Sequence, residues 1–166
     1  MSIAEAVQRA TDFLTEHPAE ARYRDSYARA KLESGLVVSV TGPGGEALRT
    51  DMPTGIGGTA TLPSPGWLLR AAEASCIVAL IAIRAAATGV TLNAVEVEVD
   101  SESDDRGILG LDPMIPAGAL SVHVRASVRA PGVSTATLQS LVAWAVDHCP
   151  VIDTVRRAVP VELEIT

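Results

Sequence analysis

Two cysteines are the residues of this 166-residue sequence whose chemistry needs an explanation. Cys76 ends the stretch "SPGWLLRAAEASC" and Cys149 ends "LVAWAVDHC". A thiolate is a nucleophile and a metal ligand, whereas a thiol on the apolar face of a helix is usually a packing group. Neither cysteine belongs to a C-x-x-C pair, and His148 beside Cys149 has no second ligand pair, so the spacing does not favour zinc. A reactive thiol and a core side chain remain as the two interpretations.

The local setting of each cysteine bears on its reactivity. Both lie on the apolar stripe of a predicted helix, and burial raises the pKa of a thiol. Glu73 lies one turn before Cys76, and Cys149 lies at a helix C-terminus, so both settings oppose a negative charge on sulfur. A reactive Cys76 therefore requires a nearby cation. The candidates are Arg29, Lys31, Arg49, Arg70 and Arg106.

The helix that carries Cys76 is predicted from its ends and its composition. Ser64 is a good N-cap, Pro65 suits the first helical position, and Gly89 is a C-terminal stop after about Thr88. The segment between them is apolar on nearly every side. Such a helix has to be buried on most faces, and one small domain can hardly cover it. We therefore expect a second subunit to help cover this helix.

The remaining elements are predicted from periodicity. Ser2 and Glu5 form a capping box for an amphipathic helix up to residue 17, and Ser134 caps a second long helix that Pro150 interrupts just after Cys149. Alternating or apolar segments predict strands at 21–32, 36–40, 46–51, 90–100, 119–130 and 160–166. The order of elements predicts an α+β fold. We expect a single domain over residues 1–166, with residues 1–20 as an N-terminal helical extension.

Charge and composition argue against several classes of function and location. The net charge of −7 does not suit nucleic acid or an anionic membrane surface. The longest helical stretch without a charge, residues 74–83, is shorter than the roughly 20 residues that a bilayer needs. The first residues lack a basic start followed by an apolar run, so no secretory signal is predicted. We therefore expect a cytoplasmic protein whose thiols are kept reduced.

Two other motifs carry less weight. Residues 55–60, "GIGGTA", match a dinucleotide-binding pattern, but prolines follow at once and no helix N-terminus faces a phosphate there. The acidic loop around residues 100–104 has its glycine misplaced for a calcium loop and is predicted to be a solvated turn. Neither motif predicts a metal or a cofactor.

The two cysteine contexts together resemble a known family. "SPGWLLRAAEASC" is similar to the P-x-x-L-L-x-A-A-x-x-x-C helix of the OsmC/Ohr family, the osmotically inducible and organic hydroperoxide resistance proteins. "LVAWAVDHCPV" resembles the second signature of that family, a helix that ends in Cys-Pro, and "DMP…GIGG" resembles the segment that precedes the first helix. The resemblance runs from about Tyr27 to the C-terminus.

The resemblance implies a fold and an activity. The fold would be two curved antiparallel sheets around two long central helices, with two chains interlaced as a homodimer. The activity would be thiol-dependent reduction of organic hydroperoxides in oxidative stress defence. Cys76 would match the peroxidatic cysteine and Cys149 the resolving cysteine. A dithiol reductant, such as a lipoyl group, would restore the thiols, and no metal or organic cofactor is implied.

The sequence also departs from the family pattern. Gly66 stands where peroxidase members carry a glutamate, and residues 33–35 lack the arginine that would bond it. Arg29, Arg49 and Glu73 are the candidates to stabilise the thiolate instead. The alternative functions are a non-catalytic binding or structural dimer with an apolar interface pocket, and a redox sensor.

Overall fold

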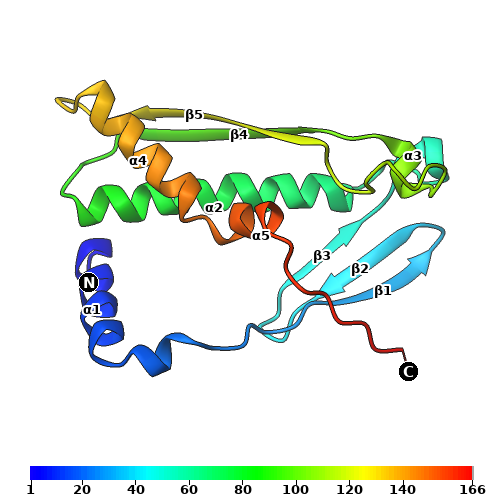
Figure 1. The fold of residues 1–166 in the computed structure, drawn as a ribbon, viewed down its shortest axis with the longest axis horizontal. Coiled ribbons are helices and arrows are strands. Elements are labelled where there is room, and N and C mark those ends of the chain that lie inside the picture. Colours follow the sequence, from blue (N-terminus) through cyan, green and yellow to red (C-terminus); the bar gives the residue numbers. More distant parts are fainter. Residues whose placement is uncertain (166) are drawn as a thin grey trace. The chain divides into compact units, whose positions relative to one another are not determined.

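The computed structural model describes residues 1–165, and Figure 1 shows its helices and strands. The chain divides into two compact units. One unit is Ala10–Leu69, and the other combines Met1–Arg9 with the chain from Arg70 onward. Each unit is described by itself.

The N-terminal helix forms as its capping box predicts. Helix α1 spans Ile3–Glu16. The Ser2 amide donates to the Glu5 carboxylate at 2.7 Å, and the Glu5 amide donates to Ser2 Oγ at 3.2 Å. This exchange satisfies amides that a helix N-terminus leaves unpaired.

The unit Ala10–Leu69 contains a three-stranded antiparallel sheet. Its strands are β1 (Arg29–Ser34), β2 (Val37–Thr41) and β3 (Ala47–Thr50), in the order β1-β2-β3. The predicted hairpin of the second and third strands is confirmed, with Val40 opposite Leu48. Short 3-10 helices lie at Pro18–Ala21 and Thr54–Ile56.

The predicted strand over residues 21–32 is wrong in its first part. Residues 22–28 have no regular structure, and β1 begins only at Arg29. The sequence "RYRDSYA" lacks a continuous alternation of apolar and polar side chains. A segment without such a face gains little from joining a half-buried sheet.

The loop before α2 is organised by one buried carboxylate. Asp51 accepts hydrogen bonds from the amide and the hydroxyl of Thr59 and from the amides of Met52 and Thr61. The Thr59 hydroxyl is the main cause that lowers the pKa of Asp51. Gly58 is packed so closely that a Cβ would lie 1.8 Å from the Met52 carbonyl oxygen. The "GIGG" stretch is therefore a close-packed loop.

The other unit contains both cysteines. Its elements are α2 (Pro65–Ala87, which begins in the preceding unit), β4 (Ala94–Glu102), α3 (Asp105–Ile108), β5 (Ser121–Arg129), α4 (Thr135–Asp147) and α5 (Pro150–Arg156). Strands β4 and β5 pair antiparallel along their whole length, with Val97 opposite Ala126. The Ser134 hydroxyl accepts the Thr137 amide at 3.2 Å and caps α4 as predicted.

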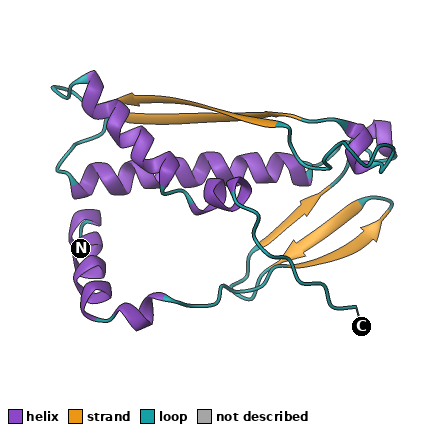
Figure 2. Cartoon of the chain, viewed as in Figure 1, coloured by secondary structure: helices purple, strands orange, loops and turns teal. Residues whose placement is uncertain are grey.

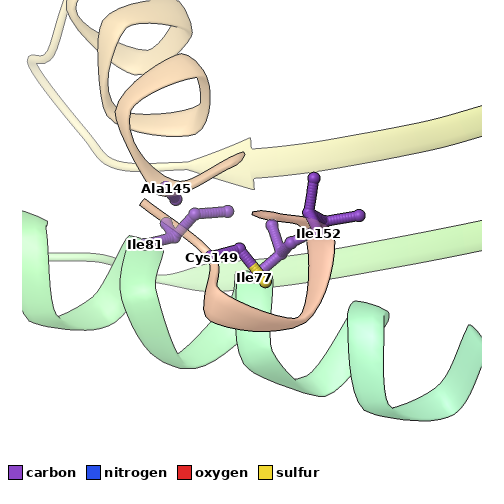
Figure 3. Close-up of a cluster of buried hydrophobic side chains, with 5 residues drawn as sticks. All are labelled: Ile77, Ile81, Ala145, Cys149 and Ile152. Carbon is purple, nitrogen blue, oxygen red and sulfur yellow. The ribbon is translucent and has the colours of Figure 1, made fainter. Parts of the chain in front are cut away.

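A small apolar core joins these elements. Ile77 and Ile81 of α2 pack with Ala145 of α4, Cys149 and Ile152 of α5, and all five side chains are buried (Figure 3). Valines of β4 and β5 pack against this cluster, and Figure 2 shows the two strands running alongside α2. The alternation that predicted these strands therefore places one face on the core.

Helix α2 is only partly covered within one chain. Its buried residues are Glu73, Ile77, Ile81 and Ala85, which form a single stripe. By length and apolar composition this helix is able to cross a membrane, although the core helix of a soluble protein passes the same test. The sequence argument that no span exists is therefore not confirmed.

The predicted closing strand at 160–166 is not present in residues 160–165, and Thr166 lies outside the described residues. Val161, Leu163 and Ile165 alternate as a strand would, yet they are 92%, 84% and 86% exposed. A strand needs a neighbour to pair its backbone groups. Within the part of the chain that the structure describes, no strand pairs with this segment.

Candidate thiol site

The structure brings the two cysteines together. Cys76 lies half-buried on α2, and Cys149 is fully buried in the N-cap position of α5. Their side chains are within hydrogen-bond reach of each other, and both are free thiols. Figure 3 shows Cys149 directed at α2 beside Ile77. The two sulfurs thus meet within one chain.

The surroundings of Cys76 hold it as a thiol. Burial raises its pKa, and the hydrogen bond and charge interaction with Cys149 raise it further. The backbone amide of Val151 hydrogen-bonds to the Cys76 sulfur and acts in the opposite direction. A buried neutral thiol is a poor nucleophile, since the thiolate is the attacking form. Among the described residues of the unit that holds both cysteines, no cation is a cause of the pKa shift of Cys76.

Glu73 is a buried acid on α2, three residues before Cys76. It is fully buried, and among the described residues neither carboxylate oxygen has a hydrogen-bond partner. Burial raises the pKa of Glu73, and the positive charge of Arg70 partly offsets that rise. Arg70 itself donates to Ser101 Oγ at 3.2 Å. Glu73 is thus a buried carboxyl that feels the positive charge of Arg70 but has no hydrogen-bond partner among the described residues.

The other candidate cations have partners of their own. In the unit Ala10–Leu69, Arg49 forms an ion pair with Glu33 at 2.6 Å, and Arg29 lies over the Tyr27 ring. Arg106 is held by the Asp104 carboxylate at 2.5 Å. Arg70 and Arg106, which belong to the same unit as Cys76, are not among the groups that shift the pKa of that thiol. A thiolate-stabilising role for Arg29 and Arg49 therefore stays a prediction.

An aromatic stack fixes the end of α4 next to Cys149. The Arg84 guanidinium lies 4.8 Å from the centre of the Trp144 ring, and His148 stacks on Trp144 with a centroid distance of 4.2 Å. The Nδ1 of His148 donates to the Trp144 carbonyl at 2.8 Å. Because Arg84 belongs to α2, this column links the helix that carries Cys76 to the C-terminal end of α4, just before Cys149. It is a positioning feature that the sequence analysis did not identify.

The sequence analysis also missed the Val151 amide. The sequence predicts that the second long helix ends at Cys149. In the structure the chain continues directly into a separate helix, α5. The signal was available in "CPV", because proline is favoured in the first turn of a helix. Helix α5 directs the Val151 amide at Cys76.

An apolar cavity lies between β5 and α4. Its volume is about 630 Å³, and its lining includes Val124, Val128, Leu138 and Val142, with Gln139 as a polar group. That volume falls in the range of small-molecule pockets, about 300–1,000 Å³. Among the described residues, no group of three or more His, Cys, Asp or Glu side chains is placed to hold a metal ion.

Comparisons with known proteins identify the family of the chain. Residues 58–164 match the family model described as OsmC-like protein. No curated protein is significantly similar to the chain. An OsmC-like protein from Mycoplasma pneumoniae is 16% identical with a TM-score of 0.69, and the match covers 82% of this chain and 91% of that one.

Two further solved structures of similar fold are of organic hydroperoxide resistance proteins. One is an organic hydroperoxide resistance protein OsmC from Legionella pneumophila, 21% identical with a TM-score of 0.61, covering 81% of this chain and 91% of that one. The other is the organic hydroperoxide resistance protein OhrB of Bacillus subtilis, 20% identical with a TM-score of 0.54, covering 86% of this chain and 98% of that one. At these identities the likeness establishes the α+β fold. The family match covers more than half of the chain and includes both cysteines, and the chain therefore belongs to the OsmC-like protein family.

Proposed function

We propose that this protein reduces organic hydroperoxides with Cys76 as the attacking thiol and Cys149 as the resolving thiol. The observation that carries the proposal is the contact between these two side chains, which are far apart in the sequence. Two thiols in contact can close a disulfide without a large rearrangement. Proteins with this fold that are described as hydroperoxide resistance proteins add support.

The proposed reaction has three steps. The Cys76 sulfur attacks the distal peroxide oxygen, the O–O bond breaks, and the leaving alkoxide takes a proton to become an alcohol. Cys76 is thereby oxidised to a sulfenic acid. Cys149 then attacks that sulfur, a disulfide forms and water leaves. A dithiol reductant, such as a lipoyl group, restores both thiols by exchange.

A homodimer is part of the proposal. Helix α2 is apolar on nearly all sides, but only one stripe of it is buried within the chain. Exposed apolar area of this extent on a helix is typical of a surface that another chain covers. A second copy of the same chain meets this need, as the family resemblance implies.

A second candidate function is favoured by the raised pKa of the Cys76 thiol. A thiol that stays protonated at neutral pH fits a binding or structural dimer, or a slow redox sensor, better than a fast peroxidase. The apolar cavity between β5 and α4 gives such a protein a place for a small hydrophobic ligand. The two candidate functions differ in whether the protein reduces peroxide in repeated catalytic cycles.

Consumption of cumene hydroperoxide in the presence of a dithiol reductant tests the proposal. The wild-type protein is expected to consume the peroxide catalytically. Cys76→Ser is expected to abolish this turnover, because among the described residues only the resolving thiol, Cys149, is left. Hydrogen peroxide is expected to be the poorer substrate, since an apolar substrate body gains about 25 cal/mol per Å² on burial. Turnover that survives in Cys76→Ser, or equal rates with both peroxides, would contradict the proposal.

A further inference from the structure

We propose that the column of Arg84, Trp144 and His148 positions the resolving cysteine: it holds Cys149 within reach of Cys76 and thereby sets how readily the two thiols close a disulfide. The inference deepens the proposed function and rests on it for its place in the peroxide cycle. The groups that act on the Cys76 thiol are Cys149 and its near neighbour in α5, so the column acts on the site only through the position of Cys149.

The first argument is the setting of the guanidinium. Arg84 lies half-buried on α2, and its guanidinium carbon lies 4.8 Å from the centre of the Trp144 ring. Among residues 1–165, no carboxylate forms a salt bridge with Arg84. A guanidinium that is partly removed from water needs another source of stabilisation, and the face of an indole supplies one. Arg84 is thus tied to α4 by its charge.

The second argument is the hold on the end of α4. The His148 ring stacks on Trp144 with a centroid distance of 4.2 Å and an angle of 16° between the planes. Its Nδ1 and its backbone amide both donate to the Trp144 carbonyl, at 2.8 and 3.0 Å. The next residue is Cys149, whose amide donates to the Val146 carbonyl at 3.4 Å. The backbone that enters Cys149 is therefore fixed by contacts to Trp144.

The third argument is that the junction of α4 and α5 is attached to α2 at two places. Trp144 contacts Arg84, and Cys149 contacts Cys76. Cys76 lies about two turns before Arg84 on α2, which separates the two attachments by about 12 Å along the axis at 1.5 Å per residue. A segment that is attached at one point turns about it, and a second attachment removes that freedom.

The consequence is a higher effective concentration of one thiol at the other. With the column intact, the reduced protein already holds the two thiols in contact, and a preorganised pair closes without a further ordering cost. Without the column, the junction populates other arrangements, and the disulfide forms only from a fraction of them. In the proposed cycle, slower closure leaves the Cys76 sulfenic acid open to a second peroxide, which oxidises it to sulfinic acid.

The equilibrium with glutathione disulfide measures this effective concentration without any peroxide. The protein dithiol loses two electrons and two protons to one glutathione disulfide, which becomes two molecules of reduced glutathione. We expect Arg84→Met, which removes the charge from the ring face, to lower the equilibrium constant for the protein disulfide roughly tenfold, the scale of a partly desolvated cation–π contact. Arg84→Lys, which keeps a cation, is expected to recover part of that loss.

The column is tested from α4 as well, with matched controls. Trp144→Leu is expected to lower the equilibrium constant, and Trp144→Phe, which keeps an aromatic face, to lower it less. Arg125→Met, on the exposed face of β5 where the arginine pairs with Glu98 and Asp100, is expected to leave the constant unchanged. Val97→Ala removes packing from the same core cluster, so it is expected to lower the free energy of unfolding in urea but not the constant.

The outcomes separate the inference from the proposed function. An unchanged constant in Arg84→Met or in Trp144→Leu overturns the inference, and so does an equal loss in Arg84→Met and Arg84→Lys. A loss in Val97→Ala as large as in Arg84→Met, or a wild-type protein that forms no disulfide in glutathione, overturns it too. If Arg84→Met does not fold, as judged by circular dichroism, the comparison of Trp144→Leu with Trp144→Phe decides in its place. If the wild-type disulfide forms in glutathione but cumene hydroperoxide does not oxidise Cys76, the proposed function fails while the glutathione comparison still decides the role of the column.

Discussion

At the scale of the residue, the buried carboxyl of Glu73 makes the stability of the protein depend on pH. Its carboxyl is buried without a hydrogen-bond partner in the described structure, and burial raises its pKa. The folded protein therefore keeps a proton that the unfolded chain loses as pH rises through the ordinary pKa of the acid. The stability of the protein is expected to decrease over the interval between the ordinary and the raised pKa.

The substitution Glu73→Gln tests this at the same residue. Both side chains are neutral below the ordinary pKa of the acid, so the two proteins are expected to unfold alike at acidic pH. Above the raised pKa the glutamate is charged and unpaired, so the variant is expected to be more stable by about 1–3 kcal/mol. Urea unfolding at several pH values measures the difference. A gap that does not change with pH would contradict the account.

The candidate site could be predicted from the sequence only in part. Cys76 and Cys149 were identifiable as a pair because their two helical contexts match one family pattern. The Val151 amide was not, because a backbone group carries no residue-type signal. The orphaned state of Glu73 was not predictable either, since it depends on which atoms pack around the carboxyl in three dimensions.

At the scale of the element, the Ile77–Ile81 stripe of α2 supports the thiol site. Ile81 is 0% exposed and packs in the same cluster as Cys149, whereas Leu69 on the same helix is 43% exposed. Ile81→Ala is expected to lower the free energy of unfolding by about 2–5 kcal/mol, because it removes buried methyl groups and leaves a cavity. Leu69→Ala, measured in the same chemical denaturation experiment, is expected to cost much less. Equal losses would show that the core is not where the structure places it.

The elements themselves were largely predictable. Helices α1, α2 and α4 begin at the caps that the sequence indicates, and the alternating valines locate β4 and β5. These features are local, so a single sequence carries them. The closing strand at 160–166 shows the limit: its alternation is real, but a strand forms only where another strand pairs with it.

At the scale of the whole molecule, the account requires a second copy. The uncovered faces of α2 and the exposed side chains of Val161, Leu163 and Ile165 are more apolar surface than a lone chain usually leaves in water. Sedimentation of the purified protein is expected to give about twice the monomer mass of 17.2 kDa. Recovery of the protein only with detergent would instead assign α2 to a membrane, and a stable monomer would leave these surfaces unexplained.

The central claim is that Cys76 and Cys149 form one redox unit, and peptide mapping after a single exposure to cumene hydroperoxide tests it most directly. The reduced wild-type protein, treated with one equivalent of the peroxide, is expected to yield a disulfide-linked peptide pair that contains both cysteines. Cys149→Ser is expected to stop at an oxygen adduct on Cys76. Free thiols at both positions after an excess of the peroxide would contradict the account.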